Sequence, residues 1–374
     1  MKLAITQSNL TLKGGAERVV LEIAKRYKAP VYVAEYDPKN TFEGYDNIDV
    51  RVISKKVNGI VPYGRISQGI SYGLAFSGLI LDDEYDVINA HMAPSHWVSM
   101  KNPNVIWYCH TPLRDVYDLY DYRMSLRKWH TRPAYALGLG IVRHMDQAAV
   151  GRTKSIVANS KNVRSRIEKY YGRRDAKVIN PGIDYKKYRN RGDDKFFFYP
   201  SRFSPNKRQE MAIEAFRRFK AHVKGYMLVL AGPVSKDKFY NDYYNSVRKE
   251  AEEVGSVKIL NDVDDATLFD LYSRCTAVLY PPMNEDFGIV PLEAMASSKP
   301  VIAMSEGGPK ETVDGSGMLV KDTDGMAAAM KLIIDNPDIP EEMGRAGRKR
   351  VVERYSWAAF FRKFDMVLKN ASDM

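Results

Sequence analysis

The sequence contains only two cysteines, Cys109 and Cys275, among 374 residues. They lie far apart without a Cys-x-x-Cys motif, which argues against a disulfide framework and a cysteine-ligated zinc site and favours free thiols in a reducing cytoplasm. No apolar run reaches the roughly 18 residues that a membrane-spanning helix needs. Residues 1–6 are too short for the apolar core of a signal peptide. We therefore expect a cytoplasmic protein that does not span a membrane.

Nucleotide-binding fingerprints are missing as well. Gly14 and Gly15 stand between a predicted strand and a predicted helix, but no Gly-x-Gly-x-x-Gly and no Gly-Lys-Ser/Thr sequence accompanies them. This disfavours a dinucleotide-dependent enzyme and a P-loop enzyme. The histidines other than His110 show no metal-ligand spacing, so they do not predict a metal site.

Acidic residues are outnumbered, with 46 Asp and Glu against 57 Lys and Arg and a net charge of +11. Such a surplus attracts an anionic partner, whether nucleic acid, acidic lipid or a phosphorylated substrate. Because no recognised nucleic-acid motif appears, we expect no nucleic-acid partner.

The basic residues are concentrated between Tyr122 and Lys154, where they interleave with apolar residues around a single acid, Asp146. This pattern is typical of an amphipathic helix that rests on an anionic membrane. A core helix with a solvated basic face has the same pattern, and we favour that interpretation.

Length and periodicity predict an α/β protein of two domains, because 374 residues exceed one usual core. Short β-branched or aromatic runs alternate with helical patterns, as parallel sheets flanked by helices require. The predicted strands are residues 2–6, 30–34, 87–90, 105–109, 155–158, 177–179, 196–199, 227–231, 257–260, 277–280 and 301–304.

The strand pattern restarts after the Pro181-Gly182 turn. We therefore expect two doubly wound, Rossmann-like domains at residues 1–181 and 182–357, with ligands in the cleft between them. Residues 358–374 are predicted to form a final helix that returns to the first domain.

Three segments carry candidate site residues beside predicted strands. The Gly14-Gly15 turn opens a helix, where unpaired N–H groups can bind a phosphate or a sugar. His110 ends a strand and can donate a hydrogen bond to a sugar hydroxyl or an anion. Arg202 and Lys207 follow the first strand of the second domain, and their cationic groups can stabilise a departing diphosphate.

A fourth segment runs from Glu285 to Glu293 and is predicted to be a loop that enters a helix. Gly288 permits a tight approach to the helix, Pro291 suits its first turn, and the free N–H groups there attract anions. Each carboxylate accepts paired sugar hydroxyls well, so two of them beside a phosphate site can hold two sugars.

Together these segments resemble the retaining glycosyltransferases of family 4, which have the GT-B fold. The matching pieces follow the family order over nearly the whole chain and are residues 14–18, 108–112, 180–184, 202 with 207, 285–293 and 307–308. The resemblance implies two Rossmann-like domains that face each other across a cleft. It also implies a hexosyltransferase that retains the anomeric configuration.

The resemblance implies roles for the candidate residues. Arg202 and Lys207 would hold the donor diphosphate, Glu293 the ribose, and Glu285 and His110 the transferred sugar. The expected catalytic residues are Glu285, Arg202, Lys207 and His110, and the expected substrate-binding residues are Gly14, Gly15, Arg202, Lys207, Glu285, Asp286, Phe287, Gly288, Ile289, Val290 and Glu293. No metal cofactor is expected, because in this family cationic residues and helix N-termini neutralise the diphosphate.

Residues 108–114 look most like mannosyltransferases of lipid-linked oligosaccharide and O-antigen assembly. GDP-mannose is therefore the first expected donor and a UDP-sugar the second. The expected acceptor is a glycan or a lipid-linked hydroxyl at the cytoplasmic membrane face. A sugar-nucleotide epimerase or hydrolase with the same fold stays open as an alternative, as does a basic nucleic-acid-binding protein with less support.

Asp262-Val263-Asp264 is a literal Asp-x-Asp, the metal and diphosphate ligand of the unrelated GT-A glycosyltransferases. It follows a predicted strand and precedes a helical pattern, so we expect these aspartates to cap a helix. In family 4 this turn commonly carries a glycine near the donor base. Asn261 and Asp262 depart from that pattern.

Overall fold

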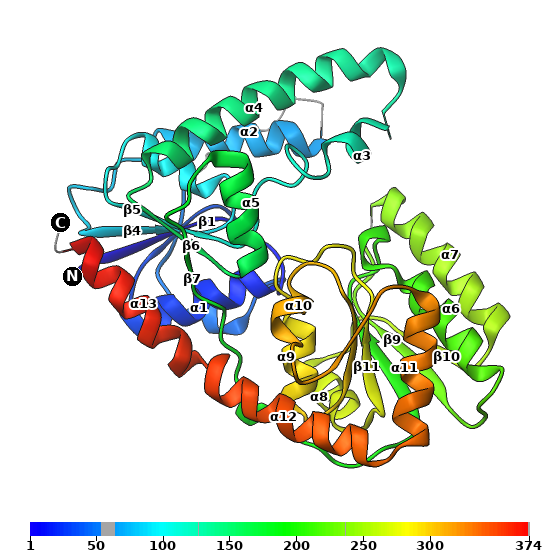
Figure 1. The fold of residues 1–374 in the computed structure, drawn as a ribbon. Helices are drawn as coiled ribbons and strands as arrows, with labels where there is room; N and C mark the ends of the chain where they lie inside the picture. Colours follow the sequence, from blue (N-terminus) through cyan, green and yellow to red (C-terminus); the bar gives the residue numbers. More distant parts are fainter. Residues whose placement is uncertain (54–63, 126, 236, 373–374) are drawn as a thin grey trace. The chain divides into compact units, whose positions relative to one another are not determined.

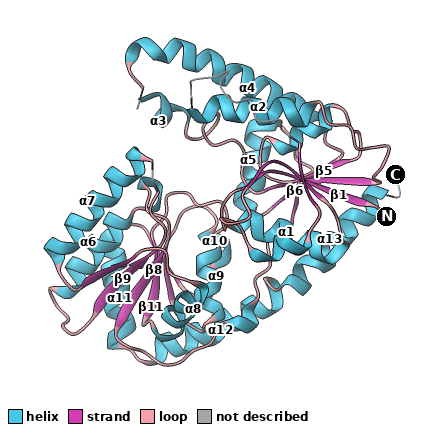
Figure 2. Cartoon of the chain, turned by 180° about the vertical axis from the view of Figure 1, so that it is seen from behind, coloured by secondary structure: helices cyan, strands magenta, loops and turns pink. Residues whose placement is uncertain are grey.

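The computed structural model describes residues 1–53, 64–125, 127–235 and 237–372. The chain forms two compact units, one of residues 1–180 with 361–374 and one of residues 181–360. Each unit is a parallel sheet with helices on both faces (Figure 1; Figure 2). No helix in the described part of the chain is both long and apolar enough to cross a membrane.

The first unit contains a parallel sheet in the order β3-β2-β1-β4-β5-β6-β7. Its strands are β1 (Leu3–Leu10), β2 (Val31–Tyr36), β3 (Val50–Val52), β4 (Val87–Ala90), β5 (Val105–Cys109), β6 (Ser155–Ala158) and β7 (Lys177–Val178). The strand order reverses between β1 and β4, which pair from Leu3↔Val87 to Thr6↔Ala90. Ligands bind at the carboxyl ends of strands at such a reversal.

The helices of the first unit cover both faces of this sheet (Figure 1). They are α1 (Gly15–Tyr27), α2 (Gly64–Ser77), α3 (Tyr120–Ser125), α4 (Arg132–Arg152) and α5 (Lys161–Tyr171), with the 3-10 turns η1 (Glu43–Asn47), η2 (Ser95–Met100) and η3 (Trp129–Thr131). The helix α1 packs through an apolar face that includes Val19, Val20 and Ile23. Packing against the sheet therefore holds the start of α1 in place.

The final helix, α13 (Trp357–Ser372), returns to the first unit, as the sequence predicted. Asp365 accepts a hydrogen bond from Arg26 Nη2 at 2.8 Å and another from the Tyr27 hydroxyl. The Tyr27 ring also packs against Phe361 and Phe364. Both ion pairing and aromatic packing therefore attach α13 to α1.

The second unit contains a parallel sheet in the order β10-β9-β8-β11-β12-β13. Its strands are β8 (Phe196–Pro200), β9 (Met227–Ala231), β10 (Val257–Leu260), β11 (Ala277–Tyr280), β12 (Val301–Met304) and β13 (Met318–Val320). Its helices are α6 (Gln209–Lys220), α7 (Lys238–Val254), α8 (Asp265–Arg274), α9 (Ile289–Ala296), α10 (Pro309–Thr312), α11 (Thr323–Asp335) and α12 (Asp338–Arg354), with the turns η4 (Tyr185–Lys187) and η5 (Pro205–Lys207). Here the strand order reverses between β8 and β11.

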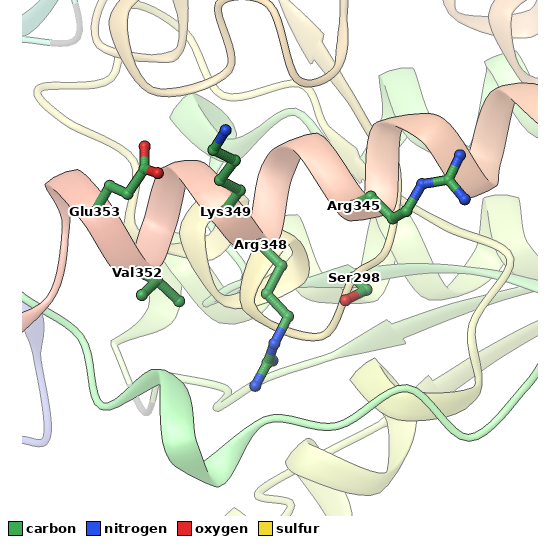
Figure 3. A pocket seen from close by; sticks show the side chains of 6 residues that line it. All are labelled: Ser298, Arg345, Arg348, Lys349, Val352 and Glu353. Carbon is green, nitrogen blue, oxygen red and sulfur yellow. The ribbon is translucent and has the colours of Figure 1, made fainter.

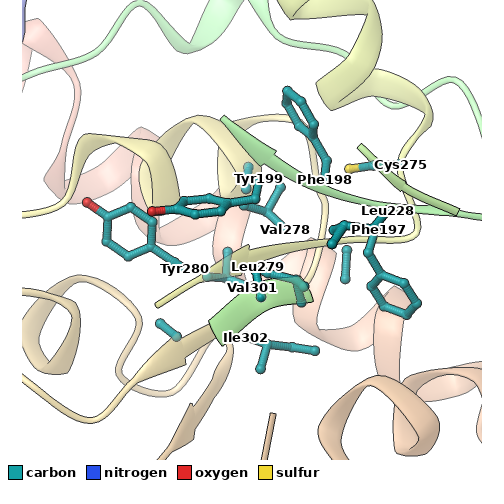
Figure 4. Close-up of a cluster of buried hydrophobic side chains, with 14 of the residues drawn as sticks. Phe197, Phe198, Tyr199, Leu228, Cys275, Val278, Leu279, Tyr280, Val301 and Ile302 are labelled. Atoms are coloured by element: carbon teal, nitrogen blue, oxygen red, sulfur yellow. The ribbon is translucent and has the colours of Figure 1, made fainter. Parts of the chain in front are cut away.

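The core of the second unit is built on its central strands (Figure 4). Every residue of β8 and of β11 is buried, which suits parallel strands with helices on both faces. Tyr199 and Tyr280 lie near the carboxyl ends of these strands, with ring centroids 6.5 Å apart. Each of these tyrosines interacts with a loop that leaves this edge, Tyr199 with Lys207 and Tyr280 with Glu285.

The structure corrects the predicted strands at three places. The two edge strands β3 and β13 were missed, because each has only three residues and no long apolar run. The strand β1 was predicted to end at Thr6 but continues through the polar Gln7 to Leu10. Gln7 is buried there because its side chain accepts from the Met92 N–H at 3.1 Å and donates to Glu17 at 3.4 Å.

Candidate active site

Three loops of the second unit meet at the carboxyl edge of its sheet. They are residues 201–208 after β8, 281–288 after β11 and 305–308 after β12. The Met283 N–H donates to the Asn206 carbonyl at 2.9 Å, and the Gly308 N–H donates to the Glu285 carbonyl at 2.7 Å. Backbone hydrogen bonds therefore join all three loops at the place where open α/β sheets bind ligands.

Lys207 and Glu285 form an ion pair in this loop cluster. Their side chains retain only 15% and 19% of their exposure, so the pair is partly shielded from water. The Lys207 carbonyl accepts from the Tyr199 hydroxyl at 2.5 Å, and Tyr280 lies against Glu285. The sequence assigned Lys207 and Glu285 to different parts of a ligand, and the structure brings them into direct contact.

Burial, together with the neighbouring Glu285 carboxylate, raises the pKa of Tyr280 well above its ordinary value. Burial also raises the pKa of Tyr199. Both phenols therefore stay protonated at neutral pH and act as hydrogen-bond donors beneath the ion pair.

Arg202 is exposed, and no other described residue forms a hydrogen bond or ion pair with its guanidinium. Its backbone carbonyl accepts from Gln209 Nε2 at 2.8 Å. A cationic side chain on an ordered backbone, with its charge uncompensated, can bind an incoming phosphate.

Arg208 and Glu306 belong to the same cluster, and the sequence did not single them out. Arg208 Nη1 lies 3.1 Å from Glu306 Oε1, and Glu306 Oε2 accepts from the Asn284 N–H at 3.2 Å. These contacts connect the first loop with the other two. The position of Arg208 directly after Lys207 could have indicated it as a site residue, but nothing in the sequence pairs Arg208 with Glu306.

Gly307 and Gly308 lie directly over the Glu285 loop. A Cβ on Gly307 would come within 2.4 Å of the Glu285 carbonyl oxygen, and one on Gly308 within 2.5 Å of the Phe287 Cα. Gly307 also has a φ of +59°, in the left-handed region. Only glycines allow the third loop to pack this closely against the second.

The loop enters α9 through Gly288, whose φ of +90° favours glycine. Phe287 is buried and its ring packs against Tyr355 at 5.9 Å between centroids. The helix has no side-chain cap at its N-terminus. The backbone N–H groups of its first turn are therefore suited to bind an anion or a hydroxyl oxygen.

Glu293 lies within α9, and two tyrosines orient its carboxylate. The Tyr188 hydroxyl donates to Oε1 at 2.9 Å, and the Tyr272 hydroxyl donates to Oε2 at 2.6 Å. Burial raises the pKa of Tyr272 well above its ordinary value, so this phenol remains a donor. Nothing in the sequence points to these tyrosines, because they lie 105 and 21 residues away from Glu293.

In the first unit, Gly14 caps α1 and Gly15 is its first residue. A Cβ on Gly14 would come within 2.3 Å of Glu17 Oε2, so the glycine makes room for a carboxylate at this helix end. Glu17 is buried. Because a carboxylate repels phosphate and accepts hydroxyl groups, this environment suits a sugar hydroxyl better than a phosphate.

His110 follows β5 and lies beside His91, which follows the neighbouring strand β4. His91 Nδ1 lies 3.0 Å from His110 Nε2, and His91 Nε2 lies 2.8 Å from Asn89 Oδ1. Burial lowers the pKa of His110 to about 3, and burial with the nearby His110 lowers the pKa of His91 well below its ordinary value. His91 is not among the residues expected from the sequence, although a signal existed: a histidine directly follows each of two consecutive predicted strands.

This neutral histidine pair predicts that stability declines in acid. In the unfolded chain both imidazoles return toward a pKa of 6.5. Because the unfolded state then binds protons first, the free energy of unfolding falls as pH drops from about 6.5 toward about 3. We expect the urea midpoint to be flat near neutral pH and to fall below about pH 6.5, with a shallower fall in a His91→Phe/His110→Phe variant. Equal slopes in the two proteins would contradict this assignment.

Of the two aspartates in the Asp-x-Asp segment, Asp264 caps a helix, as the sequence predicted, whereas Asp262 is not the cap residue. Asp264 Oδ1 accepts from the Thr267 N–H at 2.8 Å at the start of α8, and hydrogen bonding with the Thr267 side chain and backbone lowers the pKa of Asp264. Asp262 has a φ of +51°, a conformation that glycine adopts most easily. Among the described residues, no group of three or more His, Cys, Asp or Glu side chains could hold a metal ion.

The basic region between Tyr122 and Lys154 contains two different parts. Near its end, Asp146 is buried and accepts from Trp97 Nε1 at 3.2 Å, the Tyr117 hydroxyl at 3.1 Å and the Tyr171 hydroxyl at 2.7 Å. Asp146 is thus a hydrogen-bond acceptor in the core, which agrees with the core-helix interpretation of this part of the region.

At the beginning of this region, large apolar side chains are exposed. Trp129 is 80% exposed and Leu137 is 69% exposed, and Ile141 is also exposed. Exposed basic residues lie in the same segment, namely Arg127, Lys128 and Arg132. The helix α4 therefore packs on the core through one end and presents an amphipathic surface at the other.

A pocket of about 360 Å³ lies elsewhere in the second unit (Figure 3). Its lining residues are Ser298, Arg345, Arg348, Lys349, Val352 and Glu353. Ser298 lies between α9 and the amino end of β12, away from the carboxyl edge of the sheet. Arg348 already donates to the backbone carbonyls of Ala296 and Tyr188. This pocket is therefore separate from the loop cluster.

Two family models match the chain. The model described as "Glycosyltransferase Family 4" matches residues 13–187, and the model described as "Glycosyl transferases group 1" matches residues 183–350. Together they span most of both units.

Several curated relatives are described as alpha-1,3/1,6-mannosyltransferases. The chain is 26% identical over 388 residues to the human alpha-1,3/1,6-mannosyltransferase ALG2. This alignment covers 93% of this chain and 91% of the human protein. It is also 26% identical over 428 residues to the ALG2 protein of Dictyostelium discoideum, with 99% and 98% covered. A glycogen synthase of Mycobacterium tuberculosis is 26% identical over 238 residues, with 61% and 55% covered.

Solved structures share the fold. Anabaena HepE in complex with UDP and glucose superposes with a TM-score of 0.78 at 19% identity, covering 99% of this chain and 100% of that one. The sucrose-phosphate synthase of Thermosynechococcus elongatus also gives a TM-score of 0.78 at 18% identity, with 99% and 98% covered. The two parallel-sheet units are therefore those of the GT-B fold.

Proposed function

Because this chain belongs to the glycosyltransferases of the family 4 and group 1 models, we propose that it moves mannose from a nucleoside diphosphate sugar to a hydroxyl of a glycan or lipid-linked acceptor. The observation that carries the proposal is the loop cluster after β8, β11 and β12. It places the Lys207–Glu285 ion pair beside the uncapped N-terminus of α9. Cations, a helix N-terminus and a carboxylate match the diphosphate and the hydroxyls of such a donor.

In this proposal the diphosphate is bound by Arg202 and Lys207. The Lys207 ammonium has three donors, so it can contact a phosphate oxygen while it remains beside Glu285. The negative charge on the diphosphate grows as the glycosidic bond breaks, and both cations stabilise it most in the transition state. The acceptor hydroxyl attacks from the same face, so the anomeric configuration is retained, and the leaving diphosphate takes the acceptor proton.

The sugar hydroxyls are assigned to the remaining groups. Glu293, which Tyr188 and Tyr272 orient, accepts from the ribose. Glu285, with the backbone from Asp286 to Val290, binds the transferred sugar. From the first unit, His110 contacts the transferred sugar and the Gly14-Gly15 turn contacts the acceptor, for which the carboxylate of Glu17 is suited.

We propose that the reaction needs no metal ion, because two cationic side chains and a helix N-terminus supply the charge that neutralises the diphosphate. Addition of a chelator is then expected to leave the rate of sugar transfer unchanged. Loss of transfer in chelator that manganese restores would contradict this proposal.

GDP-mannose is the proposed donor, since relatives that match most of this chain are mannosyltransferases. The HepE structure contains UDP, which makes a UDP-sugar the second candidate. A ligand at about a hundred times its Kd stabilises a protein by about 2.7 kcal/mol, so the correct donor raises the Tm by several degrees.

The test compares the Tm with GDP-mannose, UDP-glucose and UDP-galactose. The expected result is stabilisation by GDP-mannose that is lost in a Lys207→Ala/Glu285→Gln variant. Stabilisation by a UDP-sugar alone would show that the donor is a UDP-sugar and not GDP-mannose. If none of the three nucleotide sugars stabilises the protein, the result would contradict the nucleotide-sugar site. Analysis of the sugar product separates transfer from hydrolysis, which releases free mannose, and from epimerisation, which releases a changed nucleotide sugar.

We also propose that the exposed surface around Trp129, Leu137 and Ile141 rests on an anionic membrane, so that the protein acts at the cytoplasmic membrane face. Apolar side chains that insert among headgroups, next to cations that attract anionic lipids, are typical of interfacial helices. The surface carries both.

Replacing Trp129, Leu137 and Ile141 together by serine is expected to lower binding to phosphatidylglycerol vesicles by about tenfold or more, because each buried apolar group contributes to membrane affinity. Cosedimentation measures this binding. The matched control is Leu332→Ser, which removes an exposed leucine from the second unit. Equal binding by the triple variant and the control would contradict a membrane role for this surface.

A further inference from the structure

Three buried polar side chains form a hydrogen-bonded row in the first unit. Asn89 is within β4, His91 follows β4, and His110 follows the adjacent strand β5. The two strands pair with Asn89 opposite Ile106 and Ala90 opposite Trp107, which brings the two histidines together. His91 also stacks on Tyr108 with ring centroids 5.4 Å apart. The row is therefore fixed by the register of the sheet and by ring packing.

The proton positions along this row follow from its end. Asn89 Nδ2 donates to the Ile106 carbonyl at 3.2 Å, and a carbonyl can only accept. The amide oxygen of Asn89 must therefore face His91, and the His91 nitrogen at 2.8 Å from it, Nε2, must carry a proton. The sheet backbone thus determines the orientation of the amide.

The tautomers of both histidines follow in turn. Burial lowers the pKa of each ring, so each is neutral and carries one proton. With its proton on Nε2, His91 has a bare Nδ1, which can only accept from His110 Nε2 at 3.0 Å. His110 is then protonated on Nε2 and bare on Nδ1.

The Nδ1 atom of His110 is not used inside the described part of the protein. No other described residue forms a hydrogen bond to this atom, and the atom is not fully buried. The residue keeps 8% of its surface exposed. A ligand can therefore reach the ring.

We propose that Asn89 and His91 are positioning residues that make His110 a hydrogen-bond acceptor, so that its Nδ1 receives the proton of one hydroxyl of the transferred sugar. This assignment rests on the proposed function only for the identity of the ligand. It reverses the donor role that a histidine at the end of a strand first suggests. It also makes the site selective for a sugar that carries a hydroxyl, and not merely an oxygen or fluorine acceptor, at the contacted position.

The tautomers are tested without any substrate. Nitrogen-15 spectra of histidine-labelled protein distinguish Nδ1–H from Nε2–H rings, and the signals that His91→Phe and His110→Ala remove identify the two residues. The expected result is a neutral Nε2–H tautomer for both. A proton on Nδ1 of His110 would overturn the proposal, whatever the enzyme transfers.

The positioning role is tested by kinetics with the donor that the wild type uses. His91→Phe keeps a stacked ring but removes the acceptor nitrogen, and His91→Asn retains an oxygen that can accept from His110. We expect kcat/KM to fall by about tenfold in His91→Phe, as for the loss of one hydrogen bond, and to recover partly in His91→Asn. In a His110→Ala background, His91→Phe should have little further effect, because it acts through His110.

Additive losses in the double variant would show a merely structural role and would overturn the proposal.

A donor series completes the test. Donors with a single sugar hydroxyl replaced by fluorine keep an acceptor but lose a proton, so one position should bind about tenfold more weakly to the wild type and equally to His110→Ala. Tolerance of fluorine at every position would overturn the proposal, because no sugar hydroxyl would then donate to His110. A wild type that binds no nucleotide sugar would instead contradict the proposed function and leave the tautomer result standing.

Discussion

Replacing Lys207 with alanine is expected to lower kcat about a hundredfold to a thousandfold while the apparent affinity for the donor changes less. The reason is that the ammonium acts on charge that develops on the leaving diphosphate, and the loss of one such donor typically has this effect. The partly shielded position of Lys207 strengthens the interaction, because screening by water and salt is reduced there. Steady-state kinetics with the identified donor measure both parameters.

Two further variants separate catalysis from folding. Lys207→Ala leaves the Glu285 carboxylate without its cation, so Lys207→Ala/Glu285→Gln removes both charges and should fold as well as the wild type. Lys249→Ala removes an exposed lysine from α7 and serves as the matched control. A double variant with kcat within about twofold of the wild type would refute the role of this pair, since each lost transition-state contact corresponds to more than 1 kcal/mol.

Replacing Gly307 with alanine is expected to destabilise the second unit and to weaken donor binding. The new Cβ would lie 2.4 Å from the Glu285 carbonyl oxygen, which is backbone and cannot rotate away. The loop that carries Glu285 must therefore move. Strain at the positive φ and the steric conflict together should lower the free energy of unfolding by about 2 to 6 kcal/mol. This corresponds to a fall in Tm of about 5 to 15 °C.

Gly315 provides the matched control, because its φ of +69° is similar to the +59° of Gly307 but nothing lies within 4 Å of its Cβ position. Gly315→Ala carries only the backbone strain, so its Tm should fall by about 2 to 4 °C with donor affinity unchanged. Thermal unfolding and donor titration of both variants provide the comparison. If the two glycines behave alike, close packing over Glu285 is not what requires glycine at position 307.

The sequence predicted the architecture well, because both sheets are parallel and buried on both faces. Strands such as Phe196–Pro200 and Ala277–Tyr280 are then continuous apolar runs that are easily recognised. The sequence could not predict the short edge strands β3 and β13, because three residues are too few for a recognisable strand pattern. Nor could it predict the extension of β1 through Gln7, because only tertiary contacts satisfy that amide.

The candidate site was predicted in part. Lys207 and Glu285 were named from their positions after predicted strands, but their ion pair depends on the adjacency of β8 and β11, which the chain order does not reveal. Tyr188, Tyr272 and Glu306 were missed because their partners are distant in the sequence. His91 could have been found from the rule that neighbouring strands end at one edge.

Sugar transfer itself is measured by incubating the protein with radiolabelled GDP-mannose and an alkyl mannoside in phosphatidylglycerol vesicles, followed by determination of the linkage of the product. The expected result is a labelled disaccharide in the α configuration, with one GDP released for each sugar transferred and no product from Lys207→Ala/Glu285→Gln. A β-linked product would contradict the retaining reaction. Failure to transfer from GDP-mannose and from every UDP-sugar would contradict the assignment of the loop cluster as a donor site.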